Sequence, residues 1–135
     1  PDDGNDANGP PGSYTYETTF SLANFDPDEA VINGLVATDN DLLDILLNGT
    51  STGISSSGFA DFVPFSIDSG FASDTNTLQF VVNNGAPTGP TGLRVSLSGF
   101  AQAAVPEPTS IALWSLLGLA GVGFGWFRWK KQRTI

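Results

Sequence analysis

The chain has 135 residues and contains no cysteine, no methionine and no histidine. Without cysteine it forms no disulfide and offers no thiolate for catalysis or for a soft metal. Without histidine it lacks the commonest general base, any Ser–His relay and imidazole ligands for a metal. These absences exclude most catalytic constellations, so we expect that the protein is not an enzyme.

Basic residues are scarce, and they are distributed unevenly along the chain. The sequence has 5 basic and 14 acidic residues, for a net charge of −9. Thirteen of the acids and one base lie in residues 1–105, a net charge of −12, whereas residues 106–135 hold one acid and four bases, a net charge of +3. A segment as acidic as the first repels a phosphate backbone, so we expect no nucleic-acid partner.

One long apolar run lies near the C-terminus. Residues 111–127 carry no charge, and as a helix they extend roughly 26 Å, slightly less than the hydrocarbon core of a bilayer. This pattern predicts a transmembrane helix over residues 111–127, followed by a basic cytoplasmic tail over residues 128–135. The predicted membrane stop consists of Arg128, Lys130, Lys131 and Arg133. By the positive-inside rule, everything before Pro106 is then exported.

A proline motif, Pro106-Glu107-Pro108, lies directly before this run, in a predicted linker over residues 102–110. The two prolines keep the backbone extended and outside the helix, where an enzyme can reach it. The motif, the apolar run and the basic end, in this order at the C-terminus, resemble the PEP-CTERM sorting signal of Gram-negative and related bacteria. The resemblance implies export, transient anchoring in the inner membrane, and recognition of Pro106, Glu107 and Pro108 by an exosortase. It also implies cleavage near the motif and delivery to the cell surface or to an extracellular polysaccharide matrix.

The exported part is predicted to form one domain over residues 13–101. Residues 1–12 are rich in Asp, Asn, Gly and Pro, and we expect a disordered lead or linker there. Because the chain begins at Pro1 without a signal peptide although its topology needs export, we expect an N-terminally truncated or mature fragment. Period-two alternation and turn residues predict six strands, at residues 14–22, 30–38, 43–47, 62–67, 77–82 and 93–98.

Local signals in these segments favour an all-β, antiparallel sandwich. Leu78, Phe80 and Val82 alternate with other residues and are predicted to face the core. Asn48-Gly49 predicts a type I′ hairpin turn, because that turn needs positive φ at both central residues. Pro64 indicates an edge strand or a bulge at residues 62–67.

Three segments together are similar to parts of galactose-binding-like jelly rolls. They are residues 38–49, with an acidic turn, a strand and Asn-Gly, residues 76–84, which begin Asn-Thr-Leu, and residues 91–95, with Gly-Leu-Arg. The resemblance covers about residues 13–101 and implies a jelly-roll-like β-sandwich. That fold usually has more strands before Tyr14, which again predicts an N-terminal truncation and exposed strand edges.

Asp39, Asn40, Asp41 and Asp44 form the densest group of oxygen-bearing side chains. Oxygen ligands in a flexible loop suit Ca²⁺, although the spacing matches no EF-hand loop. The same residues also suit turn stabilisation by Asx hydrogen bonds, or contact with another ligand, and the three interpretations stay open here. Arg94, the one base of the exported part, is expected either in a structural ion pair or on a sugar-binding face.

The sequence leaves three hypotheses for the function. In the first, a non-catalytic surface or matrix protein is processed by an exosortase and contributes adhesion or carbohydrate contact in a biofilm. In the second, the sandwich is a carbohydrate-binding accessory domain of an enzyme. In the third, the protein is structural and permanently anchored, and the Pro-Glu-Pro motif is not cut. The expected partners are an exosortase, the inner membrane and extracellular polysaccharide.

Overall fold

The computed structural model describes residues 8–85, 87–105, 114–122 and 126. The chain divides into two compact units, Pro1–Ala104 and Val105–Ile135. In the second unit, residues 114–122 are helical. No helix among the described residues has the length and apolarity needed to cross a bilayer. Part of the predicted span at 111–127 lies outside the described residues, as do Pro106, Glu107, Pro108 and the four bases of the predicted membrane stop.

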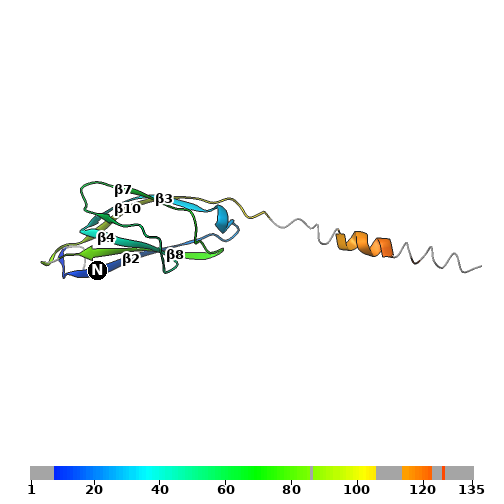
Figure 1. The fold of residues 1–135 in the computed structure, drawn as a ribbon, viewed down its shortest axis with the longest axis horizontal. Coiled ribbons are helices and arrows are strands. Elements are labelled where there is room, and N and C mark those ends of the chain that lie inside the picture. The colour runs from blue at the N-terminus through cyan, green and yellow to red at the C-terminus, as the bar shows by residue number, and fades with distance from the viewer. Residues whose placement is uncertain (1–7, 86, 106–113, 123–125, 127–135) are drawn as a thin grey trace, which may run out of the picture. The chain divides into compact units, whose positions relative to one another are not determined.

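Over its described residues, the first unit consists of antiparallel strands and one short 3-10 helix (Figure 1). Its elements are β1 (Asn8–Gly9), β2 (Gly12–Ser21), η1 (Pro27–Glu29), β3 (Val31–Asp39), β4 (Asp41–Leu47), β5 (Thr50–Ser51), β6 (Ser56–Ser57), β7 (Val63–Ile67), β8 (Thr75–Asn84), β9 (Gly89–Pro90) and β10 (Gly92–Phe100). One sheet has the order β10-β3-β7, and the larger one has the order β2-β8-β4-β5 with β6 also on β4. A small third sheet joins β1 to β9. The six predicted strands are confirmed as β2, β3, β4, β7, β8 and β10.

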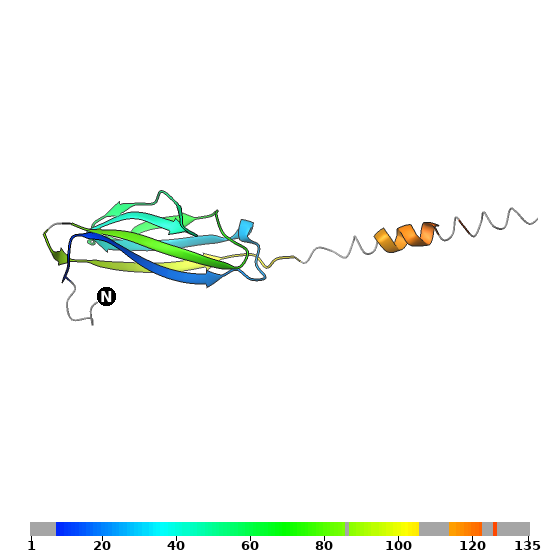
Figure 2. The ribbon, with the colours of Figure 1, turned by 90° about the horizontal axis from the view of Figure 1, so that it is seen from below.

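The two larger sheets pack face to face, as the views in Figures 1 and 2 show. The core between them combines side chains of β3 and β7 from one sheet with side chains of β4 and β8 from the other. Phe65 of β7 and Phe80 of β8 meet edge to face, with ring centroids 6.2 Å apart. The predicted inward face of β8 is confirmed, because Leu78, Phe80 and Val82 are at most 2% exposed. The first unit is therefore an all-β sandwich held by apolar burial.

Turn residues set the strand connections as the sequence predicts. Asn48 has a φ of 52° and Gly49 a φ of 78°, and the flanking residues Leu47 and Thr50 are paired across the hairpin from β4 to β5. Positive φ at both central positions confirms the expected turn, which Asn and Gly tolerate better than other residues. Pro64 lies in β7, an end strand of the three-stranded sheet. This placement confirms the prediction of an edge strand.

Asn76, at the start of β8, is fully buried and has a complete set of hydrogen bonds. Its Oδ1 accepts from the Asn48 side-chain amide at 2.8 Å and from the Ala72 N–H at 2.7 Å. Its Nδ2 donates to the backbone oxygens of Ala72 at 2.9 Å and of Asp74 at 3.0 Å. Asn48 in turn accepts the Thr77 N–H at 2.9 Å. These bonds fix the loop before β8 against the hairpin after β4.

Asn84, at the other end of β8, holds the N-terminal segment. Asn84 is 1% exposed, and its Nδ2 donates to the backbone oxygen of Gly9 at 2.8 Å and to that of Pro10 at 3.2 Å. Within the lead predicted at residues 1–12, the structure describes the residues from Asn8 onward. Of these, Asn8–Gly9 forms β1 and pairs with β9.

We expect Asn76→Ala to lower the free energy of unfolding by about 2–4 kcal/mol, because it removes the hydrogen bonds that the fully buried Asn76 side chain makes with Asn48, Ala72 and Asp74. Equilibrium urea unfolding followed by circular dichroism measures the change. Asn33→Ala is the matched control, because Asn33 is an exposed asparagine in β3, and it should shift stability by no more than ~0.5 kcal/mol. Equal effects of the two substitutions would contradict the role assigned to Asn76.

Candidate functional site

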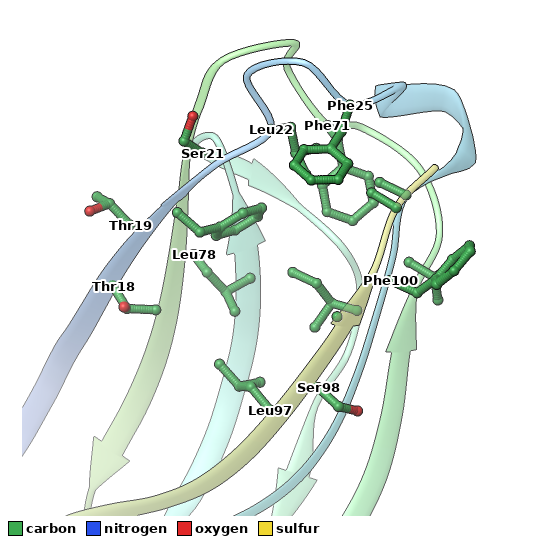
Figure 3. Close-up of a pocket in the computed structure, with 16 residues that line it drawn as sticks. Thr18, Thr19, Ser21, Leu22, Phe25, Phe71, Leu78, Leu97, Ser98 and Phe100 are labelled. Carbon is green, nitrogen blue, oxygen red and sulfur yellow. The ribbon is translucent and has the colours of Figure 1, made fainter. Parts of the chain in front are cut away.

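A cleft of about 500 Å³ lies between the edge strands β2 and β10. In the part of the chain that the structure describes, each of these strands is the end strand of its sheet. Figure 3 shows Thr18 and Thr19 on the β2 side of the cleft, with Leu97 and Ser98 on the β10 side. The volume is in the range of ligand sites, which is about 300–1,000 Å³.

Aromatic and aliphatic side chains form most of the cleft. Phe20 of β2 and Phe71 of the loop before β8 meet edge to face, with ring centroids 6.2 Å apart. Leu78, which has no exposed surface, also lines the cleft. Phe25 lines it while remaining 43% exposed, whereas the Phe100 ring, 64% exposed, points away from the cleft in Figure 3. Exposed aromatic surface that continues into a hollow is typical of a binding site rather than of a plain surface.

The polar residues among those that line the cleft carry hydroxyls and are Thr18, Thr19, Ser21 and Ser98. In Figure 3 the Thr18 side chain points into the cleft, whereas those of Thr19 and Ser98 point away from it. Ser21 Oγ donates to Asp74 Oδ1 at 3.2 Å, and Ser98 Oγ donates to the backbone oxygen of Asn33 at 3.3 Å. The residues that line the cleft include no acidic, basic or amide side chain. The lining is suited to binding apolar surface.

The inner face of β10 is more exposed than its sequence pattern suggests. Leu93, Val95 and Leu97 alternate with polar residues, as in a strand that covers a core. Leu93 is partly buried against the core, but Val95 is 38% exposed and Leu97 is 41% exposed. Val36, the partner of Val95 in β3, has no exposed surface. The difference arises because β3 lies under the opposite sheet, whereas β10 forms the edge and borders the cleft.

The predicted calcium ligands lie at and after the connection from β3 to β4. Asp39 ends β3 and Asp41 begins β4, and the peptide bond between Asp39 and Asn40 is cis. The Asn40 N–H donates to the Asn83 backbone oxygen at 3.0 Å, and the Gly58 N–H donates to the Asn40 oxygen at 2.9 Å. Asn40 Oδ1 accepts the Gly85 N–H at 2.7 Å. Asn40 thus stabilises three neighbouring segments.

Asp44 lies further along β4, after a register shift between Leu42 and Asp44. Its Oδ1 is buried, and no hydrogen-bond partner for it occurs among the described residues. The structure, over the residues it describes, brings together no group of three or more acidic, histidine or cysteine side chains that could hold a metal ion. The geometry of Asn40 favours turn stabilisation among the three interpretations, and the calcium site at Asp39, Asn40, Asp41 and Asp44 stays an untested alternative.

Arg94 makes an aromatic contact. Its guanidinium carbon lies 4.9 Å from the ring centroid of Phe62, a cation–π geometry. Both residues are exposed, and neither lines the cleft. The structure thus shows an aromatic contact for Arg94, and the ion pair and the sugar-binding face expected from the sequence stay predictions.

The sandwich ends beside the cleft. Phe25, a lining residue, forms an isolated antiparallel bridge with Ala103. The Asp26 N–H donates to the Gln102 oxygen at 2.8 Å, and the Ala104 N–H donates to the Asn24 oxygen at 2.9 Å. The second unit begins at the next residue, Val105.

Comparison with known proteins identifies one segment of the chain. The family model for the PEP-CTERM protein-sorting motif matches residues 104–130. The matched segment contains Pro106, Glu107 and Pro108, and it includes the whole apolar run at 111–127. Neither the curated proteins nor the solved structures gave a match. The match concerns the C-terminal segment and gives no information about the cleft.

We expect Asn40→Ala to lower the free energy of unfolding by about 1 kcal/mol, because the Gly85 N–H loses its acceptor. Millimolar Ca²⁺ should leave the Tm of the wild type and of the variant unchanged, because the Asn40 oxygen is already used within the protein. Thermal unfolding followed by circular dichroism, with Ca²⁺ and with EDTA, measures both effects. A rise in the Tm of the wild type alone on adding Ca²⁺ would establish a calcium site that includes Asn40.

Proposed function

We propose that this protein is an exported bacterial surface protein whose C-terminal segment is a PEP-CTERM sorting signal processed by an exosortase. The position of the family match carries the proposal. The match begins at Ala104, the residue whose N–H donates to Asn24 at the end of the sandwich. A sorting signal that is cut off must be removable without unfolding the protein that it sorts. Here the folded domain and the signal meet at one point of the chain.

The contacts that stabilise the sandwich are made by residues that precede Val105 in the chain. The apolar core and the hydrogen bonds of Asn76 involve residues of the first unit, Pro1–Ala104. Cleavage at a bond within residues 105–110 leaves these contacts and the bond from Ala104 to Asn24 in place. In this proposal the exosortase recognises Pro106, Glu107 and Pro108, and the product is the sandwich with a short C-terminal extension.

The apolar run at 111–127 supplies the transient membrane helix of the proposal. The bases Arg128, Lys130, Lys131 and Arg133 keep the C-terminus on the cytoplasmic side, as the positive-inside rule requires. The sandwich then lies on the exported side of the inner membrane until it is released. A net charge of −12 over residues 1–105 suits a protein that stays solvated after delivery to the cell surface or the matrix.

The proposed role of the sandwich is non-catalytic, in adhesion or in contact with the extracellular polysaccharide of a biofilm. The resemblance of residues 38–49, 76–84 and 91–95 to galactose-binding-like jelly rolls supports polysaccharide as the partner.

We expect the protein recovered from its native cell surface to end within residues 105–110, because the exosortase removes the apolar run. Intact-mass spectrometry of the recovered protein locates its C-terminus. The double variant Pro106→Ala/Pro108→Ala should remain in the inner membrane with Ile135 still present, because the motif no longer holds an extended backbone.

Pro87→Ala is the matched control, because Pro87 is exposed and lies outside the matched segment. This variant should be processed like the wild type. A wild-type protein that ends at Ile135 on the cell surface would overturn processing and establish the permanently anchored alternative.

A further inference from the structure

We propose that the cleft between β2 and β10 accepts an extended peptide strand from a partner protein, with apolar side chains at alternate positions and Lys or Arg at one end. The proposal concerns the sandwich and does not depend on processing by an exosortase. It rests on three properties of the cleft, which are its unpaired strand edges, its uncovered inner face and its charge.

The first property is that both walls of the cleft are strand edges. Among the described residues, β10 pairs with β3 and β2 pairs with β8, and each has no strand on its other side. In an antiparallel strand, alternate residues direct their N–H and C=O groups to opposite sides. The outer groups of β10 therefore form a row that an added strand can pair with, as in β-strand addition by peptide ligands.

The second property is that β10 has a core-type face without a core over it. Val95 and Leu97 are 38% and 41% exposed, although they lie on the same side of the sheet as Val36, which has no exposed surface. Leu97 lines the cleft, together with Phe20 and Phe71. An added strand with apolar side chains here would bury Val95 and Leu97, just as Val36 on the same face of the sheet is already buried. Because successive side chains of a strand point to opposite faces, the partner strand must also carry its apolar side chains at every second position.

The third property is the charge at one end of the cleft. Asp26, Asp28 and Glu29 lie in the chain between the lining residues Phe25 and Ala30. Asp74 accepts a hydrogen bond from the lining residue Ser21 at 3.2 Å. The one base of residues 1–105, Arg94, is stacked on Phe62 outside the lining. Among the residues that the structure describes, no base neighbours these four acids. They therefore select a partner that carries Lys or Arg beside its apolar residues.

A peptide strand fits these properties better than a sugar or a lipid does. Sugar recognition needs fixed polar groups that converge on the ligand. The described residues of the lining include no amide or charged side chain, and the hydroxyls of Thr19 and Ser98 point away from the cleft in Figure 3. An anionic membrane surface is repelled by the acids at the end of the cleft. Neither ligand uses the unpaired edge of β10, whereas a strand does.

The test uses the full chain in nanodiscs of zwitterionic lipid and a panel of labelled peptides about as long as β10. In the panel, Val, Leu or Phe alternates with Thr, and two Lys end each peptide. Fluorescence anisotropy measures the Kd, and hydrogen exchange measures protection of the β10 amides. We expect binding that weakens as salt rises, and slower exchange in β10, because the added strand pairs with its outer edge.

Two peptide controls and two protein variants sharpen the result. Peptides with Pro in place of Thr, or with Glu in place of Lys, should bind more weakly, because they lose backbone donors or the attraction to the acids. Leu97→Thr should raise the Kd roughly tenfold. Leu35→Thr should leave it unchanged, because Leu35 has nearly the same exposure at 42%, lies in the neighbouring strand β3 and does not line the cleft.

Each alternative result overturns the proposal. No binding by any member of the panel at millimolar concentration excludes a strand acceptor. Binding without slower exchange in β10, or with equal loss in Leu97→Thr and Leu35→Thr, places the peptide elsewhere. Tighter binding of a neutral polysaccharide or of the empty nanodisc by the cleft, with the same sensitivity to Leu97→Thr, identifies a sugar or lipid site instead.

Discussion

The contact between the two inner sheet faces, centred on Phe65 and Phe80, is the interaction on which the rest of the sandwich depends. The buried core comes from β3 and β7 on one side and from β4 and β8 on the other. The outer strands β2 and β10 contribute only partly buried side chains such as Tyr16 and Leu93. The core therefore stops before it reaches the edges of the sheets. The cleft occupies the place where this burial ends, so its apolar character is continuous with that of the core.

Strand β8 carries a buried asparagine near each end, and the two asparagines hold the segments at both ends of the sandwich by hydrogen bonds. Asn76 binds the loop before β8 and the hairpin after β4, and Asn84 binds the N-terminal segment at Gly9 and Pro10. An amide offers both donors and an acceptor, so it can satisfy the backbone groups of loops that have no strand partner. The apolar residues between the two asparagines supply stability, and the asparagines position the loops. Phe71, in the loop held by Asn76, reaches the cleft by this route.

The strands could be predicted from the sequence because alternation and turn residues are local signals. Asn48-Gly49 predicts its turn because both residues tolerate positive φ, and Pro64 predicts an edge strand because it has no N–H to donate. The cleft could not be predicted in this way, because Phe20, Phe71 and Leu97 come from three distant segments and their exposure depends on which strands end up at the edges. The alternation of apolar and polar residues in β10 predicts a strand with one buried face, whereas Val95 and Leu97 on that face are partly exposed. In the sequence Asn76 belongs to a segment that resembles a jelly roll, whereas its structural role depends on Ala72 and Asn48, which the fold brings next to it.

The point where the chain leaves the sandwich also has a mechanical consequence. Any tension on the C-terminal segment enters the domain through Ala104, Gln102 and the end of β10, and the first bonds to bear it are those to Asn24 and Asp26. The next is the nine-residue ladder between β10 and β3, whereas the contact between Phe65 and Phe80 bears load only after that ladder parts. A pull from the envelope would therefore peel off an edge strand before it opened the core. The domain would therefore unfold under force in steps, and β10, the strand beside the cleft, would detach first.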